Sequence, residues 1–300
     1  MSHAWLLLPD LMLILVGAAL CRFPLLGRPI WDAAERLVYY LLFPTLLFNS
    51  ILKSPLDAQL TLGLGLCGVA TVACGVVLAY ASRALPGVDA RLHASAAQTA
   101  FRFNSFIALA LAERLHGAQG VAWMALLIAL CVPLCNVAAV WPLARHGGHD
   151  YGRELVRNPL IVATLAGLVA NLAGVRFPVA VDITLQRIGV SALPLALMAV
   201  GAGLRFGGLR EAPGFAGLLL AIRHVALPLF ALGVSAWLAL PPAQRAVLIA
   251  FAALPTASSA YVLAVRMGGN GAYVATIVTL STLLGMLSLP SWLAVLQAWP

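Results

Sequence analysis

The sequence predicts an all-α integral membrane protein of ten transmembrane helices, arranged as two inverted five-helix repeats with crossed, broken helices four and nine. Three observations support this fold class: the composition, the spacing of apolar segments and the similarity of the two halves. Of the 300 residues, 62% are hydrophobic and only 9% are charged. Soluble domains carry roughly 25% charged residues, so this chain has too little polar surface to face water on all sides.

Apolar segments recur along the whole chain, each about as long as the roughly 20 residues that cross a bilayer as a helix. They cover residues 5–22, 33–52, 59–82, 92–113, 118–143, 158–174, 183–204, 214–240, 243–265 and 271–296. The longest polar stretch, 144–157, lies at the midpoint of the chain. We therefore expect a first five-helix repeat at 1–143, a linker at 144–157 and a second repeat at 158–300.

Basic residues are unevenly distributed over the predicted loops, with ten in the odd-numbered and four in the even-numbered loops. Because cytoplasmic loops are enriched in Lys and Arg, we expect the linker in the cytoplasm and both termini outside. The net charge of +8 arises mainly from these scattered loop residues. The sequence contains no basic patch with interleaved aromatic residues, so we expect no nucleic acid partner. Short loops and the lack of a targeting segment favour the inner membrane of a bacterium.

The two halves share residues at a nearly constant offset. Asp32 and Pro44 recur 150 residues later as Asp182 and Pro194, and the tripeptide Arg-Phe-Pro follows the first apolar segment of each half. Because five spans is an odd number, the second copy enters the membrane in the opposite orientation. Inverted repeats are typical of secondary transporters, since the two-fold relation gives inward-facing and outward-facing states of similar energy.

The candidate binding site lies where the fourth and ninth segments are interrupted. At an offset of 152 residues, Phe103 corresponds to Pro255, which removes a helical hydrogen bond. If both helices break and cross here, two helix N-termini point at one site, which favours an anion. The candidate substrate-binding residues are Arg102, Asn104, Ser105, Pro255, Thr256, Ser258 and Ser259.

Arg102 lies about ten residues into its predicted span, at a depth where an arginine is costly without a role. We interpret it as the group that binds a carboxylate in fork geometry. The alternatives are an arginine that snorkels to the membrane interface or one that satisfies carbonyls at the broken helix. Further candidates for the cavity or for coupling are Asn136, Arg223, His224 and Ser281. The alternatives are a cap at a helix kink for Asn136, reach to the membrane interface for Arg223 and His224, and a helix contact for Ser281.

The acidic residues inside or beside spans, among them Asp32, Glu35 and Asp182, favour ion-pair roles with Arg36 and Arg187. The five cysteines form no CxxC pair and show no zinc-site spacing. We expect no catalytic group, no metal and no cofactor, while coupling to Na⁺ or H⁺ stays open.

Five motifs occur in a specific order along the chain. They are Leu-Phe-Pro-Thr-Leu at 42–46, Phe-Arg-Phe-Asn-Ser at 101–105, Arg-Asn-Pro-Leu-Ile at 157–161, Leu-Pro-Leu-Ala-Leu at 193–197 and Leu-Pro-Thr-Ala-Ser-Ser at 254–259. With them the chain resembles the auxin efflux carrier family, which includes bacterial carriers of malonate and similar acids. The chain departs from the plant carriers because it has no long central loop and has Phe103 where a proline is expected.

The resemblance implies the ten-helix fold of bile-acid/sodium symporters. Spans 1, 2, 6 and 7 would form a scaffold, and spans 3–5 and 8–10 a moving core. It also implies elevator-type alternating access and a homodimer through the scaffold helices. The family's crossover asparagine corresponds to Asn104 and its crossover proline to Pro255.

The sequence thus predicts a secondary transporter of a small organic anion, a carboxylate, in the lipid bilayer. The alternative is a sodium-coupled symporter of a larger amphipathic anion, which Na⁺-dependent transport would reveal. An enzyme embedded in the membrane would need a catalytic constellation within the spans, and a channel would show flux that does not saturate.

Overall fold

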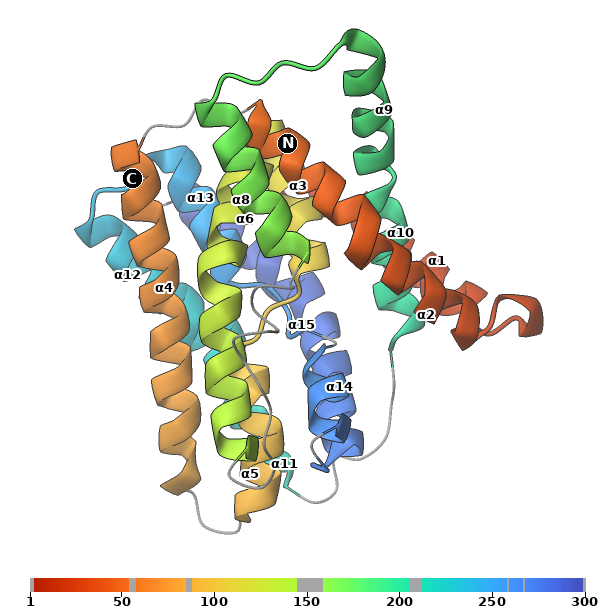
Figure 1. Ribbon diagram of the computed structural model, residues 1–300. Helices are drawn as coiled ribbons and strands as arrows, with labels where there is room; N and C mark the ends of the chain where they lie inside the picture. The colour runs from red at the N-terminus through yellow and green to blue at the C-terminus, as the bar shows by residue number, and fades with distance from the viewer. Residues whose placement is uncertain are drawn as a thin grey trace.

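The computed structural model describes residues 3–53, 58–84, 88–144, 159–204, 212–257, 259–266 and 268–298. These residues are almost entirely helical, and the one β-bridge among them joins Phe103 to Thr256. Figure 1 shows long helices running roughly side by side through the molecule, among them α4 and α6. The predicted linker lies, apart from its first residue, outside the described ranges.

The first half of the chain contains six α-helices in the described ranges. They are α1 (His3–Leu20), α2 (Arg28–Leu37), α3 (Phe43–Leu52), α4 (Ala58–Ala81), α5 (Ala90–Ala96) and α6 (Ser105–Ala144), with the 3-10 turns η1 (Pro24–Leu26), η3 (Ser82–Ala84) and η4 (Ala97–Ala100). A π-helical turn, η2 (Val38–Leu42), joins α2 to α3. Non-helical backbone at His116 and Gly117, where φ of Gly117 is +55°, divides α6 into two helices. This division falls between the predicted spans 92–113 and 118–143.

The second half contains helices with a similar succession of breaks. They are α8 (Pro159–Leu172), α9 (Val179–Val190), α10 (Ala192–Ala202), α11 (Pro213–Ala221), α12 (Leu227–Trp237), α13 (Pro242–Ala252), α14 (Ser259–Arg266) and α15 (Gly271–Ala298). A second π-helical turn, η5 (Ile222–Ala226), joins α11 to α12. Each π-helical turn is followed by a proline, Pro44 or Pro228, at the start of the next helix. Proline has no N–H to donate, which suits the first turn of a helix.

Several helices are long and apolar enough to cross a membrane. The described residues contain five such helices: Leu62–Ala84, Ser105–Ala139, Val179–Ala202, Pro213–Trp237 and Gly271–Leu296. A sixth candidate is the pair Met12–Leu20 and Pro24–Asn49, which is bent by 114°. The chain is therefore a multi-pass membrane protein. Because several of the ten predicted segments consist of short helices separated by bends, the number ten stays a prediction.

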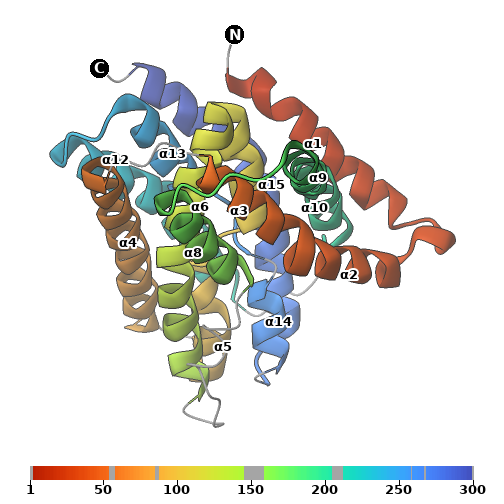
Figure 2. The same ribbon diagram turned by 45° about the horizontal axis from the view of Figure 1, so that its top comes forward.

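Glycines allow helices from the two halves to approach closely. Figures 1 and 2 both show α1 passing beside α10. A Cβ atom added to Gly17 would collide with the backbone of Met198, and one added to Gly201 would collide with the backbone of Ile14. Small residues at membrane helix contacts let backbones pack closely, since lipid provides no hydrophobic driving force between helices.

Ion pairs form within α2 and between the end of α3 and the start of α9. Arg28 binds Asp32 at 2.8 Å and Glu35 at 3.0 Å, and Lys53 binds Asp182 at 2.6 Å. The expectation of ion pairs at these three carboxylates is met, but the partners are Arg28 and Lys53 in place of the neighbouring arginines. Partners on other turns or other helices cannot be read from adjacency in the sequence.

Candidate anion site

Two helical segments from opposite halves are interrupted and meet at their interruptions. Helical structure ends at Ala100 and resumes at Ser105 in the first half, and it ends at Ala252 and resumes at Ser259 in the second. The backbone N–H of Asn104 donates to the carbonyl of Pro255 at 2.9 Å. Unwound backbone at membrane depth needs such internal partners, because lipid offers none. Both interruptions occur where the sequence predicts them.

Asn104 ends the first interruption by capping α6. Its side-chain Oδ1 accepts hydrogen bonds from the backbone N–H groups of Phe106 at 3.0 Å and Ile107 at 3.3 Å. Asparagine is among the best N-cap residues because its oxygen satisfies these otherwise free donors. The side chain is only 4% exposed, so the cap fixes the direction in which α6 leaves the break.

A cavity of about 230 Å³ lies beside the two interruptions. Its lining consists of Tyr39, Arg102, Phe103, Asn104, Ser105, Phe106, Val132, Cys135, Asn136, Ala257 and Ser259. Five of the candidate residues, Arg102, Asn104, Ser105, Asn136 and Ser259, are therefore brought together at one cavity. Arg102 donates from Nη2 to the hydroxyl of Ser259 at 3.0 Å, across the two halves.

The electrostatic character of this cavity is positive. Arg102 supplies a full charge, and α6 and α14 both begin at residues of the lining, Ser105 and Ser259. A helix N-terminus carries roughly half a positive elementary charge. The residues that line the cavity include no Asp or Glu. Within the described ranges, no three His, Cys, Asp or Glu side chains are grouped closely enough to hold a metal ion.

Pro255 and Thr256, also predicted at the second interruption, are not part of the cavity lining. Thr256 is fully buried, and its hydroxyl donates to the carbonyl of Thr99 at 2.7 Å. Pro255 packs close to Gly285. Ser258 lies outside the described residues. Thr256 and Pro255 thus hold the interruption in place, while Ala257 and Ser259 face the cavity.

Three of the four further candidates, Arg223, His224 and Ser281, form a separate, buried group. Arg223, 1% exposed, donates to the carbonyls of Leu254 and Phe251, at 2.5 Å from Nε and 3.1 Å from Nη2. His224 lies between two hydroxyls, with Nε2 2.9 Å from Ser281 Oγ and Nδ1 2.9 Å from Ser288 Oγ. None of Arg223, His224 and Ser281 is part of the cavity lining.

A short chain of hydrogen bonds connects this buried group to the second interruption. Ser281 Oγ accepts the backbone N–H of Thr256 at 2.9 Å. Trp292 donates from Nε1 to the carbonyl of His224 at 2.8 Å. The contacts therefore give Arg223, His224 and Ser281 a role in holding the broken helix.

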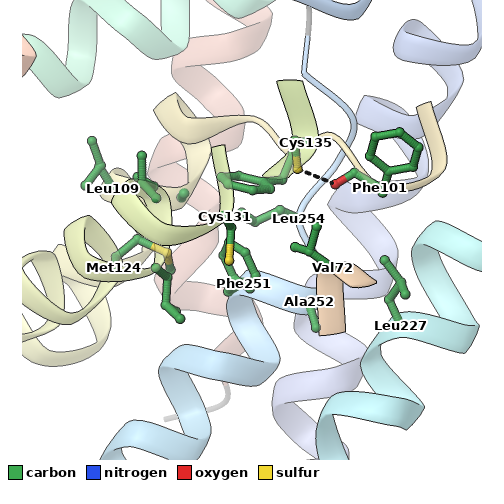
Figure 3. Packing of buried hydrophobic residues seen from close by; sticks show 14 of the residues in the cluster. Val72, Phe101, Leu109, Met124, Cys131, Cys135, Leu227, Phe251, Ala252 and Leu254 are labelled. Carbon is green, nitrogen blue, oxygen red and sulfur yellow. Dashed lines mark hydrogen bonds between the residues drawn. The ribbon is translucent and has the colours of Figure 1, made fainter. Parts of the chain in front are cut away.

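Of the lining residues that were not candidates from the sequence, Tyr39 and Cys135 carry a hydroxyl or a thiol. Tyr39 belongs to the π-helical turn η2, and Cys135 donates from Sγ to the carbonyl of Phe101 at 3.5 Å. Figure 3 shows this contact within the cluster of buried apolar residues that surrounds the interruptions. π-Helical turns are frequent at functional sites, but the apolar sequence around Tyr39 carries no signal that separates such a turn from a regular helix.

Comparison with known proteins gives two matches. Residues 148–293 match the model of a family described as membrane transport protein. A protein of Methanothermobacter thermautotrophicus named as an uncharacterized transporter is 27% identical over 292 residues, which cover 95% of this chain and 96% of that protein. These matches confirm the resemblance to the auxin efflux carrier family that the motifs indicate.

Proposed function

We propose that this chain, which matches the membrane transport protein family over residues 148–293, is a secondary transporter that carries a small organic anion, with a carboxylate as its substrate class. Transport is the function that the family and the relative indicate, and it is consistent with a protein that is not an enzyme. The anion is inferred from the chemistry of the cavity.

One observation carries the proposal: a positively charged cavity lies where two broken helices from opposite halves meet. Arg102 offers paired N–H donors in a planar fork that matches the two oxygens of a carboxylate. The N-termini of α6 and α14 add positive potential. Ser105, Asn136 and Ser259 offer further polar contacts around the same space. In transporters with inverted repeats, such half-helix N-termini near the membrane midplane are typical binding sites for anionic groups.

The size of the cavity favours a small substrate. Sites for drug-sized ligands occupy about 300–1,000 Å³, whereas this cavity has about 230 Å³. This supports a small carboxylate over the alternative, a larger amphipathic anion carried together with sodium. Transport that requires Na⁺ would favour the alternative.

We further propose that the chain crosses the inner membrane ten times, as two inverted five-helix repeats. Figure 2 places the start of α1 and the end of α15 toward the same end of the bundle, as an even number of spans requires. Helices α1, α3, α8, α9 and α10 pack on one another and would form the scaffold. The contacts of α4 with α6, α12 and α13 would form part of a core that moves as in an elevator. Both termini would lie outside and the linker in the cytoplasm, and the scaffold would offer a surface for a homodimer.

The proposal is tested by thermal stabilisation of the purified protein with a panel of small mono- and dicarboxylates, with and without Na⁺. A ligand at a hundred times its dissociation constant adds about 2.7 kcal/mol to the free energy of unfolding. We expect one class of acid to stabilise the parent but not Arg102→Ala. Arg187→Ala is the matched control, because Arg187 is exposed on α9.

Two outcomes would contradict the proposed function. In the first, no acid stabilises the parent. In the second, Arg102→Ala responds to the acid as strongly as Arg187→Ala does. Dependence of the stabilisation on Na⁺ would identify sodium as the coupling ion.

A further inference from the structure

Arg223 is a buried charge that the anion cavity itself does not use. It lies in the π-helical turn η5, in the middle of the candidate span Pro213–Trp237, and its side chain is 1% exposed. A charged side chain at such depth is expensive, so it normally has a specific partner or function. Among the described residues, no Asp or Glu lies within ion-pair distance of Arg223. The compensation for this charge must come from other groups.

The hydrogen bonds of Arg223 place its charge at the end of α13. The guanidinium donates to the carbonyls of Phe251 and Leu254, in the last turn of α13 and just beyond it. A helix C-terminus carries roughly half a negative elementary charge, and an arginine that bonds its last carbonyls neutralises that charge. About half a positive charge is then left without compensation in the protein interior.

The end of α13 lies next to the anion cavity. Leu254 lies at the start of the interruption, and Ala257 and Ser259, at its other end, line the cavity. Cys135, also in the lining, donates to the carbonyl of Phe101, the residue before Arg102. Without Arg223, the negative end of α13 would oppose the positive start of α14 at the same site.

The surroundings of Arg223 hold it in this position. His224, the next residue, is fixed between the hydroxyls of Ser281 and Ser288, and its carbonyl accepts from Trp292. The π-helical turn and the bonds of His224 to α15 therefore fix the backbone from which Arg223 extends. A charge held this rigidly needs no rearrangement when a ligand arrives.

We infer that Arg223 is a positioning residue that sets the charge selectivity of the cavity: it neutralises the C-terminal end of α13, so that a carboxylate is preferred over an uncharged molecule of the same shape. This inference rests on the proposed anion transport. Arg102 would contact the substrate. Arg223 would make the electrostatic potential in the cavity more positive, because it neutralises the carbonyls at the end of α13.

The test compares the acid that best stabilises the parent with its primary amide, which has nearly the same shape and no charge. Dissociation constants of both ligands are measured for the full-length parent, Arg223→Gln and Arg223→Lys. We expect Arg223→Gln to lose about tenfold or more of the preference for the acid, with little change for the amide, as removal of a nearby unit charge predicts. Arg223→Lys keeps the charge and should keep both affinities within about threefold.

The outcomes separate this inference from the proposed function. If Arg223→Gln weakens acid and amide equally, Arg223 has only a structural role and the inference is overturned. If Arg223→Gln does not fold, the affinities of Arg223→Lys for the acid and the amide decide. Loss of both affinities would overturn the inference, and retention of both would support it. If the acid binds the parent through Arg102 and Arg223→Gln keeps the full preference, only the inference fails. If no acid binds the parent, both fail.

Discussion

The two interrupted helices offer a comparison within one molecule, because their backbones are alike and their chemistry differs. Each has a helix that ends, a short unwound stretch and a helix that begins at the cavity. At the first interruption, neutral groups satisfy the freed carbonyls: the hydroxyl of Thr256 bonds Thr99, and the thiol of Cys135 bonds Phe101. At the second, the charged guanidinium of Arg223 does so.

The two arginines are likewise divided between the interruptions. Arg102 belongs to the first, is half-buried and lines the cavity, whereas Arg223 is completely enclosed at the second. One charge is available to a ligand, and the other is committed to the protein backbone. Two similar breaks in the backbone would thus differ in role, with ligand binding proposed at one and a structural role at the other, provided that each freed carbonyl finds a partner.

The largest expected effect is a loss of folding stability when Arg223, the arginine bonded to the backbone, is removed. We expect Arg223→Ala to lower the free energy of unfolding by about 3 kcal/mol, because two buried carbonyls lose their donors at about 1–3 kcal/mol each, and removal of a buried charge offsets part of that loss. Arg102→Ala should change it by less than about 1 kcal/mol, since Arg102 borders an open cavity. Thermal unfolding of both variants in the same detergent, without ligand, measures the difference. Equal destabilisation by the two variants would contradict this division of roles.

A second substitution, Asn104→Asp, tests the proposed binding of an anion at the first interruption. Asp is as good an N-cap as Asn, so Asn104→Asp should leave α6 and the unfolding transition almost unchanged. The new carboxylate would lie in the anion cavity, where like charges a few ångströms apart repel strongly, and we expect the affinity for the acid to fall about thirtyfold or more. Titration of the purified variant with the acid measures this.

Thr256→Val provides the matched variant at the other interruption. It removes a hydroxyl that faces Thr99 and not the cavity, so it should cost about 1–3 kcal/mol of folding stability and change acid affinity little. An acid affinity that falls more in Thr256→Val than in Asn104→Asp would mean that the second interruption, and not the first, binds the anion.

The sequence was sufficient to locate both interruptions, because Pro255 and the polar residues around Asn104 are exceptional within apolar segments. It was also sufficient to select Arg102 and Ser259, which meet across the cavity. Which side of an unwound stretch faces the cavity was not predictable. In extended backbone, neighbouring side chains point to opposite sides, so Ala257 lines the cavity while Thr256 is turned away.

Contacts between residues far apart in the sequence were also not predictable from the sequence. Arg223 bonds carbonyls 28 and 31 residues further along the chain, and backbone carbonyls are the same for every residue type. Tyr39 reaches the cavity because a π-helical turn shifts its position on the helix surface, and periodicity alone assigns a regular helix there.

The smallest expected effect concerns the bond that joins the two interruptions. Ser259 accepts a hydrogen bond from Arg102 at 3.0 Å, so its hydroxyl occupies a donor that the carboxylate would use. The net value of such a bond is about 0.5–1.5 kcal/mol, and a bound anion replaces Ser259 as the acceptor. We therefore expect Ser259→Ala to change the affinity for the acid by less than about fivefold, with Ser105→Ala as the matched loss of a cavity hydroxyl. A loss of affinity close to that of Arg102→Ala would show that the substrate is held by both halves together, and that the first interruption alone does not supply the binding group.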